Sequence, residues 1–350
     1  MSELRLGIIG CGRPWKTPGA TGFGMSHAHM KGYKACADVK LAACCDIIAE
    51  RAKLFQSEHG AERTYVDYRK MLKKEKLDIV SVATWPHLHA EMVVAAAKAG
   101  VKAIHCEKPM ATNWGDAKRM VKACGENGVQ LTFNHQRRFG EAFRKAKELL
   151  KAGAIGNLVR LEGKCGDMYD WGTHWIDMLF FYNDEAPVDW VMGQVELRGH
   201  GKIFGAPVEG QGLAHLKFRN GVRGLMVTGY EASIGAENRL VGTEGVIEVG
   251  VSKDVNLRVW GKKQKGWQVI PTAEGLHSED MIRRGILDLI SSLQTKREPE
   301  LAARRALQAT EVIFAVYESS RRRGRVDLPL DVDDSALVAM LAERKMDEAK

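Results

Sequence analysis

The chain of 350 residues is too long for one ordinary domain and suits two. Its 45% hydrophobic and 27% charged residues are typical of a soluble globular protein, and no apolar run approaches the length of a membrane span. The net charge of +8 is modest, and no nucleic-acid motif accompanies the basic clusters at 70–76 and 321–325, so neither a membrane nor a nucleic acid is expected as a partner. Seven cysteines without regular spacing, and a first strand only a few residues from Met1, predict a cytoplasmic protein without a signal peptide.

Strands and helices alternate over the first 133 residues. Strands are predicted at 4–10, 39–46, 64–66, 77–84, 101–106 and 130–133. Helices are predicted between them at 26–36, 49–59, 68–74, 91–99 and 113–127. Short buried strands separated by helices are typical of a doubly wound parallel sheet, so residues 1–133 are predicted to form an α/β dinucleotide-binding domain of the Rossmann type.

Strands follow one another without intervening helices over much of residues 134–350. They are predicted at 158–164, 188–198, 212–218, 222–229, 239–241, 246–249 and 257–260, with a hairpin turn at 219–221. Helices are predicted at 141–152, 173–182, 279–293 and 302–322. This pattern predicts an α+β domain with a large, mostly antiparallel open sheet, which would bind the substrate. Because the helices are too few to cover both faces of that sheet, a homodimer or homotetramer is expected.

The first strand runs into an interrupted glycine motif. Without residues 13–21, the loop reads Gly10-Cys11-Gly12-Gly22-Phe23-Gly24, which is G-x-G-x-x-G between a strand and a helix. Such glycines allow a tight turn and a close approach of the backbone to a pyrophosphate at the amino terminus of a helix. The nine added residues contain two prolines, Trp15 and Lys16. They are expected either to cover the cofactor or substrate entrance, or to contact another subunit.

The second strand ends at Asp46, 22 residues after Gly24. An acid at about this spacing binds the ribose hydroxyls of the dinucleotide, and its charge repels a 2′-phosphate. The sequence therefore predicts NAD as the cofactor in preference to NADP. A helix cap is the alternative role for Asp46.

Glu107-Lys108-Pro109 follows the fifth strand, at the edge of the sheet where ligands bind. With the glycine loop, Ala83 to His89, Asp170 to Asp177 and the turn at 240–245, this motif resembles the glucose–fructose oxidoreductase / inositol dehydrogenase / MocA family over nearly the whole chain. The resemblance implies a Rossmann oxidoreductase in which Lys108 lies between nicotinamide and substrate. It also implies cofactor contacts for Thr84, His89 and Glu107.

A second polar cluster runs from Tyr169 to Asp177. The spacing of Asp170, His174 and Asp177 suits one face of a helix, and a histidine can accept the proton of a hydroxyl that is being oxidised. The family pattern implies that His174 is the base and that Asp170 contacts the substrate. A capping Asp170 with a core His174 is the alternative. No metal site is predicted.

Aromatic and basic side chains near these motifs suit the C–H faces and hydroxyls of a sugar or cyclitol. The predicted substrate contacts are Trp85, Arg137, Tyr169, Asp170, Trp171 and His174. Trp85-Pro86 stands where the family more often has Pro-Asn, and the loop before Asp170 is shorter than is usual in the family. Both departures leave the identity of the substrate open, but not the fold.

The leading hypothesis is an NAD-dependent dehydrogenase that acts on a hydroxyl carbon of a sugar, sugar derivative or cyclitol. The alternative is a redox glycosidase, in which bound NAD would oxidise a sugar transiently to allow elimination of a glycoside. Net formation of NADH distinguishes the two.

Overall fold

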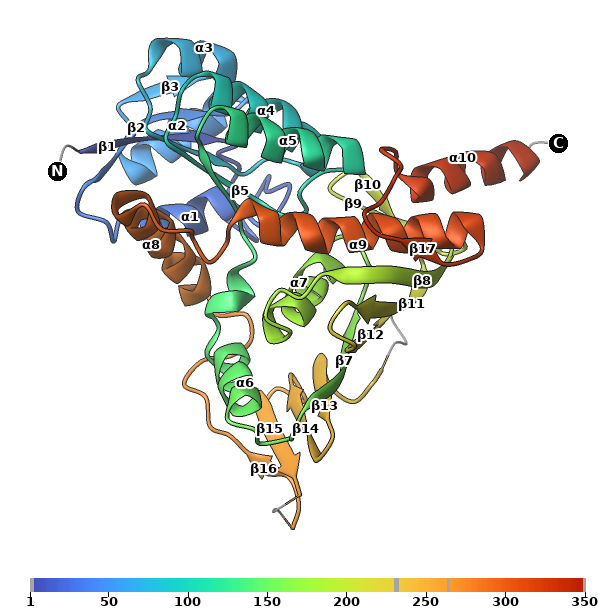
Figure 1. The fold of residues 1–350 in the computed structure, drawn as a ribbon. Helices are drawn as coiled ribbons and strands as arrows, with labels where there is room; N and C mark the ends of the chain where they lie inside the picture. The colour runs from blue at the N-terminus through green and yellow to red at the C-terminus, as the bar shows by residue number, and fades with distance from the viewer. Residues whose placement is uncertain (1–2, 230–232, 263–264, 349–350) are drawn as a thin grey trace. The chain divides into compact units, whose positions relative to one another are not determined.

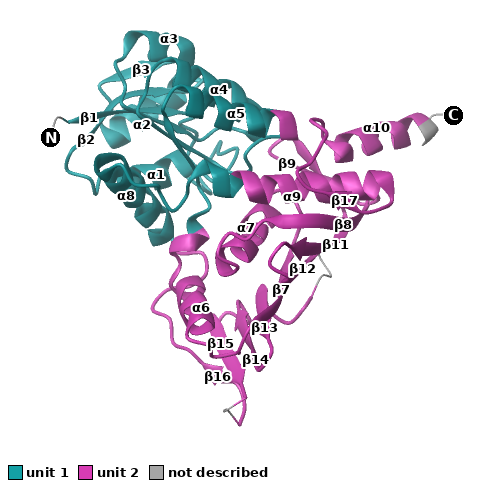
Figure 2. Ribbon diagram, in the orientation of Figure 1, with its two compact units in different colours: residues 1–112, 116–136, 279–306 teal, residues 113–115, 137–278, 307–350 magenta. Residues whose placement is uncertain are grey.

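The computed structural model describes residues 3–229, 233–262 and 265–348 (Figure 1). The chain forms two compact units (Figure 2). Unit 1 comprises residues 1–112, 116–136 and 279–306, and unit 2 comprises residues 113–115, 137–278 and 307–350. The predicted division into 1–133 and 134–350 differs from these units chiefly at 279–306, a segment that returns to the N-terminal unit.

Unit 1 is built on a six-stranded parallel sheet in the order β3-β2-β1-β4-β5-β6. The strands are β1 (Leu4–Ile9), β2 (Val39–Cys45), β3 (Arg63–Tyr65), β4 (Ile79–Val82), β5 (Ala103–Cys106) and β6 (Gln130–Phe133). The helices between them are α1 (Met25–Tyr33), α2 (Ala49–His59), α3 (Tyr68–Lys74), α4 (Pro86–Lys98) and α5 (Trp114–Glu126). This order is that of a Rossmann fold, which confirms the predicted doubly wound sheet. The strand order reverses between β1 and β4, where such folds bind their ligands.

A helix far along the chain completes the core of unit 1. The apolar face of α8 (Asp280–Thr295) buries Ile286, Leu289 and Ile290 in one cluster with residues of β1, β2, α1 and α2. A side chain at Gly32 of α1 would lie 2.7 Å from Cβ of Ile286, so glycine permits the close approach of α1 and α8. The sequence predicted the helix but not its partner, because an amphipathic pattern identifies a buried face and not the surface that buries it.

Unit 2 is built on a nine-stranded sheet in the order β16-β15-β14-β13-β7-β12-β11-β8-β17. Its strands are β7 (Leu158–Cys165), β8 (Val188–Glu196), β11 (Gln211–Phe218), β12 (Arg223–Thr228), β13 (Asn238–Gly242), β14 (Gly245–Val249), β15 (Leu257–Gly261), β16 (Gln268–Val269) and β17 (Val326–Asp327). All described pairs are antiparallel except β7 with β12. The mostly antiparallel sheet and the hairpin at 219–221 are confirmed.

Helices pack on one face of this sheet. The unit contains α6 (Glu141–Lys151), α7 (Gly172–Tyr182), α9 (Ala303–Arg322) and α10 (Ala336–Glu348), with a short 3₁₀ turn at Gln136–Phe139. The close approach of α9 to β8 depends on Gly193 of β8, since a Cβ there would lie 2.8 Å from Cγ1 of Val316 in α9. The Gly193 N–H also donates a hydrogen bond to Ser319 Oγ of α9 at 2.8 Å.

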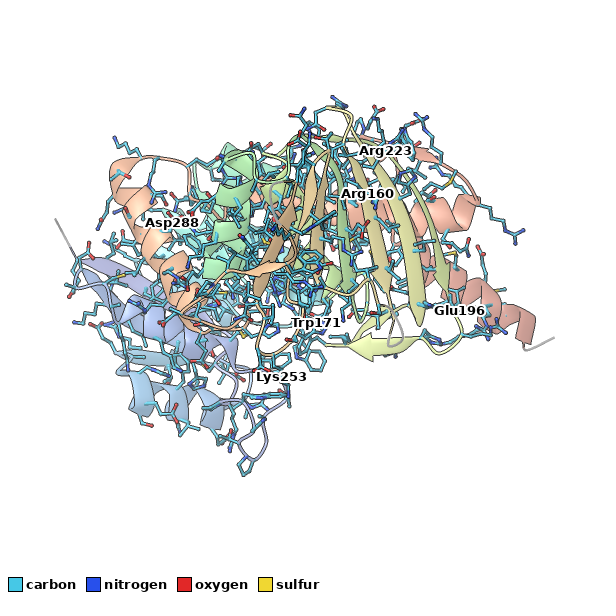
Figure 3. All side chains as sticks on the ribbon, turned by 90° about the horizontal axis from the view of Figure 1, so that it is seen from below. Arg160, Trp171, Glu196, Arg223, Lys253 and Asp288 are labelled. Carbon is cyan, nitrogen blue, oxygen red and sulfur yellow. The ribbon has the colours of Figure 1, made fainter. Side chains whose placement is uncertain are left out.

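The opposite face of the nine-stranded sheet is not covered by α9. It carries the exposed apolar side chains of Met192, Leu213 and Trp260. A row of alternating charges crosses the same sheet, with Glu162, Arg239, Glu248 and Arg258 as successive neighbours on β7, β13, β14 and β15. Arg160 and Arg223 are direct neighbours on β7 and β12 (Figure 3).

Several elements were not predicted. Helix α10 and the two-stranded ribbon of β9 (Gly201–Ile203) and β10 (Ala206–Val208) have short or irregular apolar patterns. All seven cysteines are buried and unpaired. Among the described residues, no helix combines the length and apolar character needed to cross a bilayer.

Candidate active site

The glycine loop lies between β1 and α1, as predicted. Gly10 and Gly12 have φ of +88° and +58°, values that favour glycine. A Cβ at Gly10 would lie 2.6 Å from the carbonyl oxygen of Ala83 and 2.8 Å from Cγ2 of Thr84, whereas a Cβ at Gly12 would meet nothing within 4 Å. Gly24 directly precedes α1 in a left-handed conformation, and a Cβ there would collide with the backbone of Arg13. The loop therefore packs against β4 on one side and leaves open space above Gly12, which fits the pyrophosphate of a dinucleotide.

Asp46 holds this loop. It is buried at the end of β2, where its Oδ2 accepts a hydrogen bond from the Gly12 N–H at 3.0 Å and its Oδ1 accepts one from the Ile48 N–H at 2.9 Å. One carboxylate therefore fixes the glycine turn and the chain that enters α2. The alternative role of a helix cap is wrong, because Ile48 is the residue that caps α2. The contact of Asp46 with the ribose stays a prediction.

The inserted residues form a compact turn. Pro14 O accepts from the Thr17 N–H at 3.2 Å and from Thr17 Oγ1 at 2.7 Å, and Arg13 Nη1 donates to Pro18 O at 2.9 Å. The rings of Trp15 and Phe23 lie 4.5 Å apart at their centroids, and both are exposed. The insertion is thus held by its own hydrogen bonds and by bonds from Arg51 of α2 to Gly19 O and Thr21 Oγ1, and it presents an aromatic surface to solvent.

Glu107 is the centre of a buried polar network. Its Oε1 accepts hydrogen bonds from His29 Nε2 at 2.8 Å and from Asn134 Nδ2 at 2.7 Å, while His29 Nδ1 lies 2.8 Å from Ser81 Oγ. Burial alone would raise the pKa of Glu107, but His29, Lys108 and Asn134 outweigh burial and lower that pKa to about 2. Glu107 is therefore a fixed anion that ties β5 to α1 and β6, and it supports the backbone from which Lys108 projects.

His89 braces the same loop from α4. Its Nδ1 lies 3.0 Å from Pro109 O, and its Nε2 lies 3.0 Å from Thr84 O. The ring is fully buried, so its contacts connect the segment after β4 to the Glu107-Lys108-Pro109 segment. Thr84 and Lys108 are partly exposed at these two segments. Trp85 is 41% exposed and directly precedes α4.

In unit 2, the loop after β7 carries the second predicted cluster. Helix α7 begins at Gly172, so Asp170 lies before the helix and the expectation that Asp170, His174 and Asp177 share one helical face is wrong. The cause is a turn at 167–171, in which Asp167 Oδ1 accepts from the Asp170 N–H. His174 lies in the first turn of α7, and Tyr169, Asp170 and His174 are all buried. Burial, Asp170 and Asp167 raise the pKa of Tyr169 well above its usual value.

Asp177 forms a buried ion pair. Its Oδ2 and Oδ1 accept from Arg138 Nε and Nη2, both at 2.8 Å, and both side chains are fully buried. Glu185 accepts a further bond from Arg138 at 2.6 Å. Arg138 and Asp177 thereby fix α7 relative to the turn at Gln136–Phe139.

Arg137, the neighbouring arginine, has a different environment. Its guanidinium stacks 4.6 Å from the ring centroid of Trp175 and 5.6 Å from that of Trp171, and its Nη2 lies 3.4 Å from His277 Nδ1. The residue is 3% exposed, yet among the described residues its Nε and Nη1 have no hydrogen-bond partner. Burial lowers the pKa of Arg137 to about 10, against the opposing effect of Glu237. Two buried donors of this cation therefore have no hydrogen-bond partner among the described residues.

A cavity of about 250 Å³ is lined by side chains that contact Arg137, although not by Arg137 itself. Three residues that contact the guanidinium, Trp171, Trp175 and His277, line the cavity. The other lining residues are Lys164, Cys165, Gly166, Gly229 and Glu237. Trp171 is 39% exposed and is labelled in Figure 3. The combination of flat aromatic faces with cationic and hydrogen-bonding groups suits a small polyhydroxylated ligand.

Behind the 167–171 turn lies a network that the sequence did not reveal. Buried Glu209 accepts from the Met168 N–H at 2.6 Å, from Thr228 Oγ1 at 2.7 Å and from Tyr317 OH at 2.8 Å. Burial and the nearby carboxylates raise the pKa of Asp167 to about 7. Glu209 and Tyr317 are far from Met168 in sequence, and no local pattern connects them; the same holds for His29 and Asn134 around Glu107.

These geometries define a class, a Rossmann oxidoreductase with a dinucleotide cradle in unit 1 and a polar, aromatic cavity in unit 2. Residues 4–135 match the family model described as an oxidoreductase family with an NAD-binding Rossmann fold, and residues 165–248 match the GFO/IDH/MocA C-terminal domain. The chain belongs to the glucose–fructose oxidoreductase / inositol dehydrogenase / MocA family, as the sequence motifs predicted.

Two relatives and one solved structure illustrate this similarity. D-apiose dehydrogenase of Paraburkholderia graminis is 34% identical over 156 residues, which are 45% of this chain and only 38% of that protein. The scyllo-inositol 2-dehydrogenase (NAD(+)) of Bacillus subtilis is 25% identical over 288 residues, 77% of this chain and 80% of that protein. The WlbA dehydrogenase from Bordetella pertussis, solved with NADH and UDP-GlcNAcA, has a TM-score of 0.74 at 26% identity and covers 94% of this chain and 100% of that chain.

Proposed function

We propose that the protein is an NAD-dependent dehydrogenase that acts on a hydroxyl carbon of a sugar, sugar acid or cyclitol. The observation that carries this proposal is the glycine loop, in which Gly12 is bonded to Asp46 and has open space above it. When bound there, NAD would supply the hydride acceptor. Asp46 favours NAD because its carboxylate would face the 2′-phosphate of NADP.

Lys108 and His174 are proposed to perform the chemistry. An ammonium group beside the carbinol oxygen stabilises the negative charge that develops there as the hydride leaves. The neutral imidazole of His174 accepts the hydroxyl proton, and Asp170 orients the substrate. Glu107 and His89 act as positioning residues, since their hydrogen bonds fix the segments that carry Lys108 and Thr84.

The environment of Arg137 favours an anionic substrate. A buried guanidinium with two unused donors is costly unless a ligand completes its hydrogen bonds. A carboxylate accepts such bonds in pairs, and Lys164 is a cation that lines the cavity. Within the proposed class, this arrangement favours a sugar acid over a neutral sugar, while Trp171 and Trp175 would contact the C–H faces of the ring.

The uncovered face of the nine-stranded sheet is proposed to form a homodimer or homotetramer interface in a cytoplasmic enzyme. Exposed Met192 and Leu213 lie on the adjacent strands β8 and β11, and β12 separates them from the charge row that begins at Glu162 on β7. Apolar side chains bordered by paired charges are typical of a surface that another subunit covers.

A panel of sugars, sugar acids, cyclitols and aryl glycosides, assayed for NADH and for released aglycone, tests the proposed activity. A dehydrogenase produces one NADH for each oxidised substrate and releases no aglycone. The named relatives are dehydrogenases and give the redox glycosidase no support. Release of aglycone without net NADH, or no turnover of any polyol, would overturn the proposal.

A further inference from the structure

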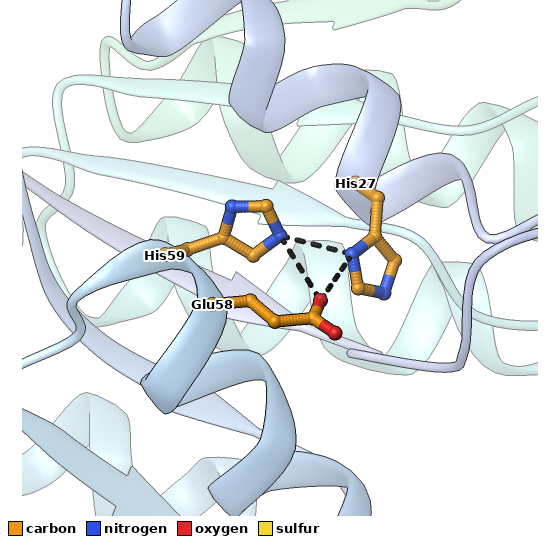
Figure 4. Close-up of side chains that lie close together, drawn as sticks. All are labelled: His27, Glu58 and His59. Carbon is orange, nitrogen blue, oxygen red and sulfur yellow. Dashed lines mark hydrogen bonds and ion pairs between the residues drawn. The ribbon is translucent and has the colours of Figure 1, made fainter.

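Two histidines and a glutamate converge in unit 1, apart from the residues discussed above (Figure 4). His27 lies in the first turn of α1, and Glu58 and His59 form the end of α2. His27 Nδ1 is 2.9 Å from His59 Nε2 and 3.3 Å from Glu58 Oε2, and His59 Nε2 is 3.8 Å from the same carboxylate oxygen. One ligand atom from each side chain therefore points to a common centre.

The spacing of these three atoms matches a tetrahedral metal site. Bonds of about 2.0–2.1 Å from zinc to imidazole nitrogen or carboxylate oxygen place neighbouring ligand atoms about 3.3 Å apart. The observed separations of 2.9, 3.3 and 3.8 Å lie on both sides of this value. Two neutral imidazoles and one carboxylate form a donor set that suits borderline cations such as Zn²⁺ better than Ca²⁺ or Mg²⁺.

The three side chains lie between an aromatic ring and solvent. The ring of Phe55 packs against both histidines, at centroid distances of 4.9 Å and 4.4 Å. Glu58 is 38% exposed, so this side of the cluster is open to solvent.

We propose that His27, Glu58 and His59 bind a divalent ion of the zinc class, with water as the fourth ligand. The ion joins the start of α1 to the end of α2. Because α1 begins directly after the glycine loop and α2 follows Asp46, the ion stabilises the two segments that hold the dinucleotide. The role is structural. No local motif indicates this site, since 30 residues separate His27 from the adjacent pair Glu58 and His59.

The test is a zinc titration of untagged, chelator-stripped protein in competition with a colorimetric zinc indicator. The wild-type protein is expected to bind one Zn²⁺ per chain and to melt at a higher temperature with zinc than without it. Loss of a residue that only hydrogen-bonds to a metal ligand usually weakens metal binding by roughly 10–100-fold. His27→Ala and His59→Ala each remove a ligand itself, so each should weaken zinc binding by more than this. His200→Ala, which removes an exposed histidine of unit 2, is the matched control and should bind as the wild type does.

Cobalt distinguishes this site from adventitious binding by cysteine. Co²⁺ at the site should give the absorption of a tetrahedral complex without a thiolate charge-transfer band, because all ligands are nitrogen or oxygen. If a histidine variant does not fold, Glu58→Gln decides the question, since this half-exposed side chain can be replaced without opening the core. Two results would show that the cluster is only a hydrogen-bonded histidine pair. One is equal zinc affinity of the wild type and these variants, and the other is a wild-type protein that cannot take zinc from the indicator.

Discussion

Alanine at Gly12 should separate the cost of backbone strain from the loss of the dinucleotide cradle. With φ at +58° and nothing within 4 Å of the added methyl group, Gly12→Ala meets only the left-handed strain, about 1–2 kcal/mol. Gly128→Ala, with φ at +66° and equally open space, is the matched control and should lose the same free energy of unfolding.

Gly10→Ala should destabilise the protein more than either variant. Its methyl group would lie 2.6 Å from Ala83 O, so the segment after β4 must move, which adds about 1–3 kcal/mol to the strain. Urea unfolding without cofactor measures these differences.

Affinity for the dinucleotide gives the decisive comparison. Titration followed by NADH fluorescence should show about a 10-fold or greater loss, about 1.4 kcal/mol, for Gly12→Ala, because the methyl group occupies the space proposed for the pyrophosphate. Gly128→Ala should bind NADH as the wild type does. Equal affinities of Gly12→Ala and Gly128→Ala would refute the assignment of this loop as the cradle.

Three further predictions follow from other parts of the molecule. Asp46→Ser should narrow the kcat/KM preference for NAD over NADP, and a wild-type enzyme that uses NADP better would contradict the role of this carboxylate. The raised pKa of Asp167 means that its contribution to stability is complete below pH 3.8 and is lost as the pH rises towards about 7. Asp167→Asn can still accept from the Asp170 N–H, so in urea unfolding its free energy of unfolding should exceed that of the wild type by up to about 4 kcal/mol at pH 8 and by little at pH 4. An equal gain at both pH values would exclude titration of Asp167 as the cause. Leu213→Asp on the uncovered sheet face should lower the mass measured by light scattering towards the monomer mass of 38.8 kDa, whereas the control Val338→Asp on α10 should leave that mass unchanged. A wild-type protein that is monomeric would contradict the proposed interface.

Local pattern was sufficient for much of the fold. The alternation of buried strands and helices predicted the parallel sheet, and Arg219-Asn220-Gly221 predicted the β11–β12 hairpin because both features depend on neighbouring residues. The return of α8 to unit 1 and the parallel pairing of β7 with β12 depend on tertiary packing, which periodicity does not encode.

The site shows the same division. Gly10, Gly12 and Asp46 could be found from a strand, a turn and a fixed spacing, and their contacts support that interpretation. The partners of Glu107 could not, because His29 and Asn134 approach it from other elements of the sheet. The spacing suggested that Asp170 shares a helical face with His174 and Asp177, but Asp170 precedes α7, since the sequence does not show that Asp167 holds a turn there.

The most direct test of the proposed dehydrogenase measures NADH formation by Lys108→Ala, His174→Ala and the double variant on the best substrate of the panel. Each single change should lower kcat by on the order of 10²-fold or more, the usual effect of losing a general base or a charge stabiliser. NADH affinity should stay unchanged, because the glycine loop and Asp46 hold the cofactor separately. The double variant should be little worse than either single variant if both groups serve one step. Near-full activity of His174→Ala or Lys108→Ala would contradict the proposed chemistry.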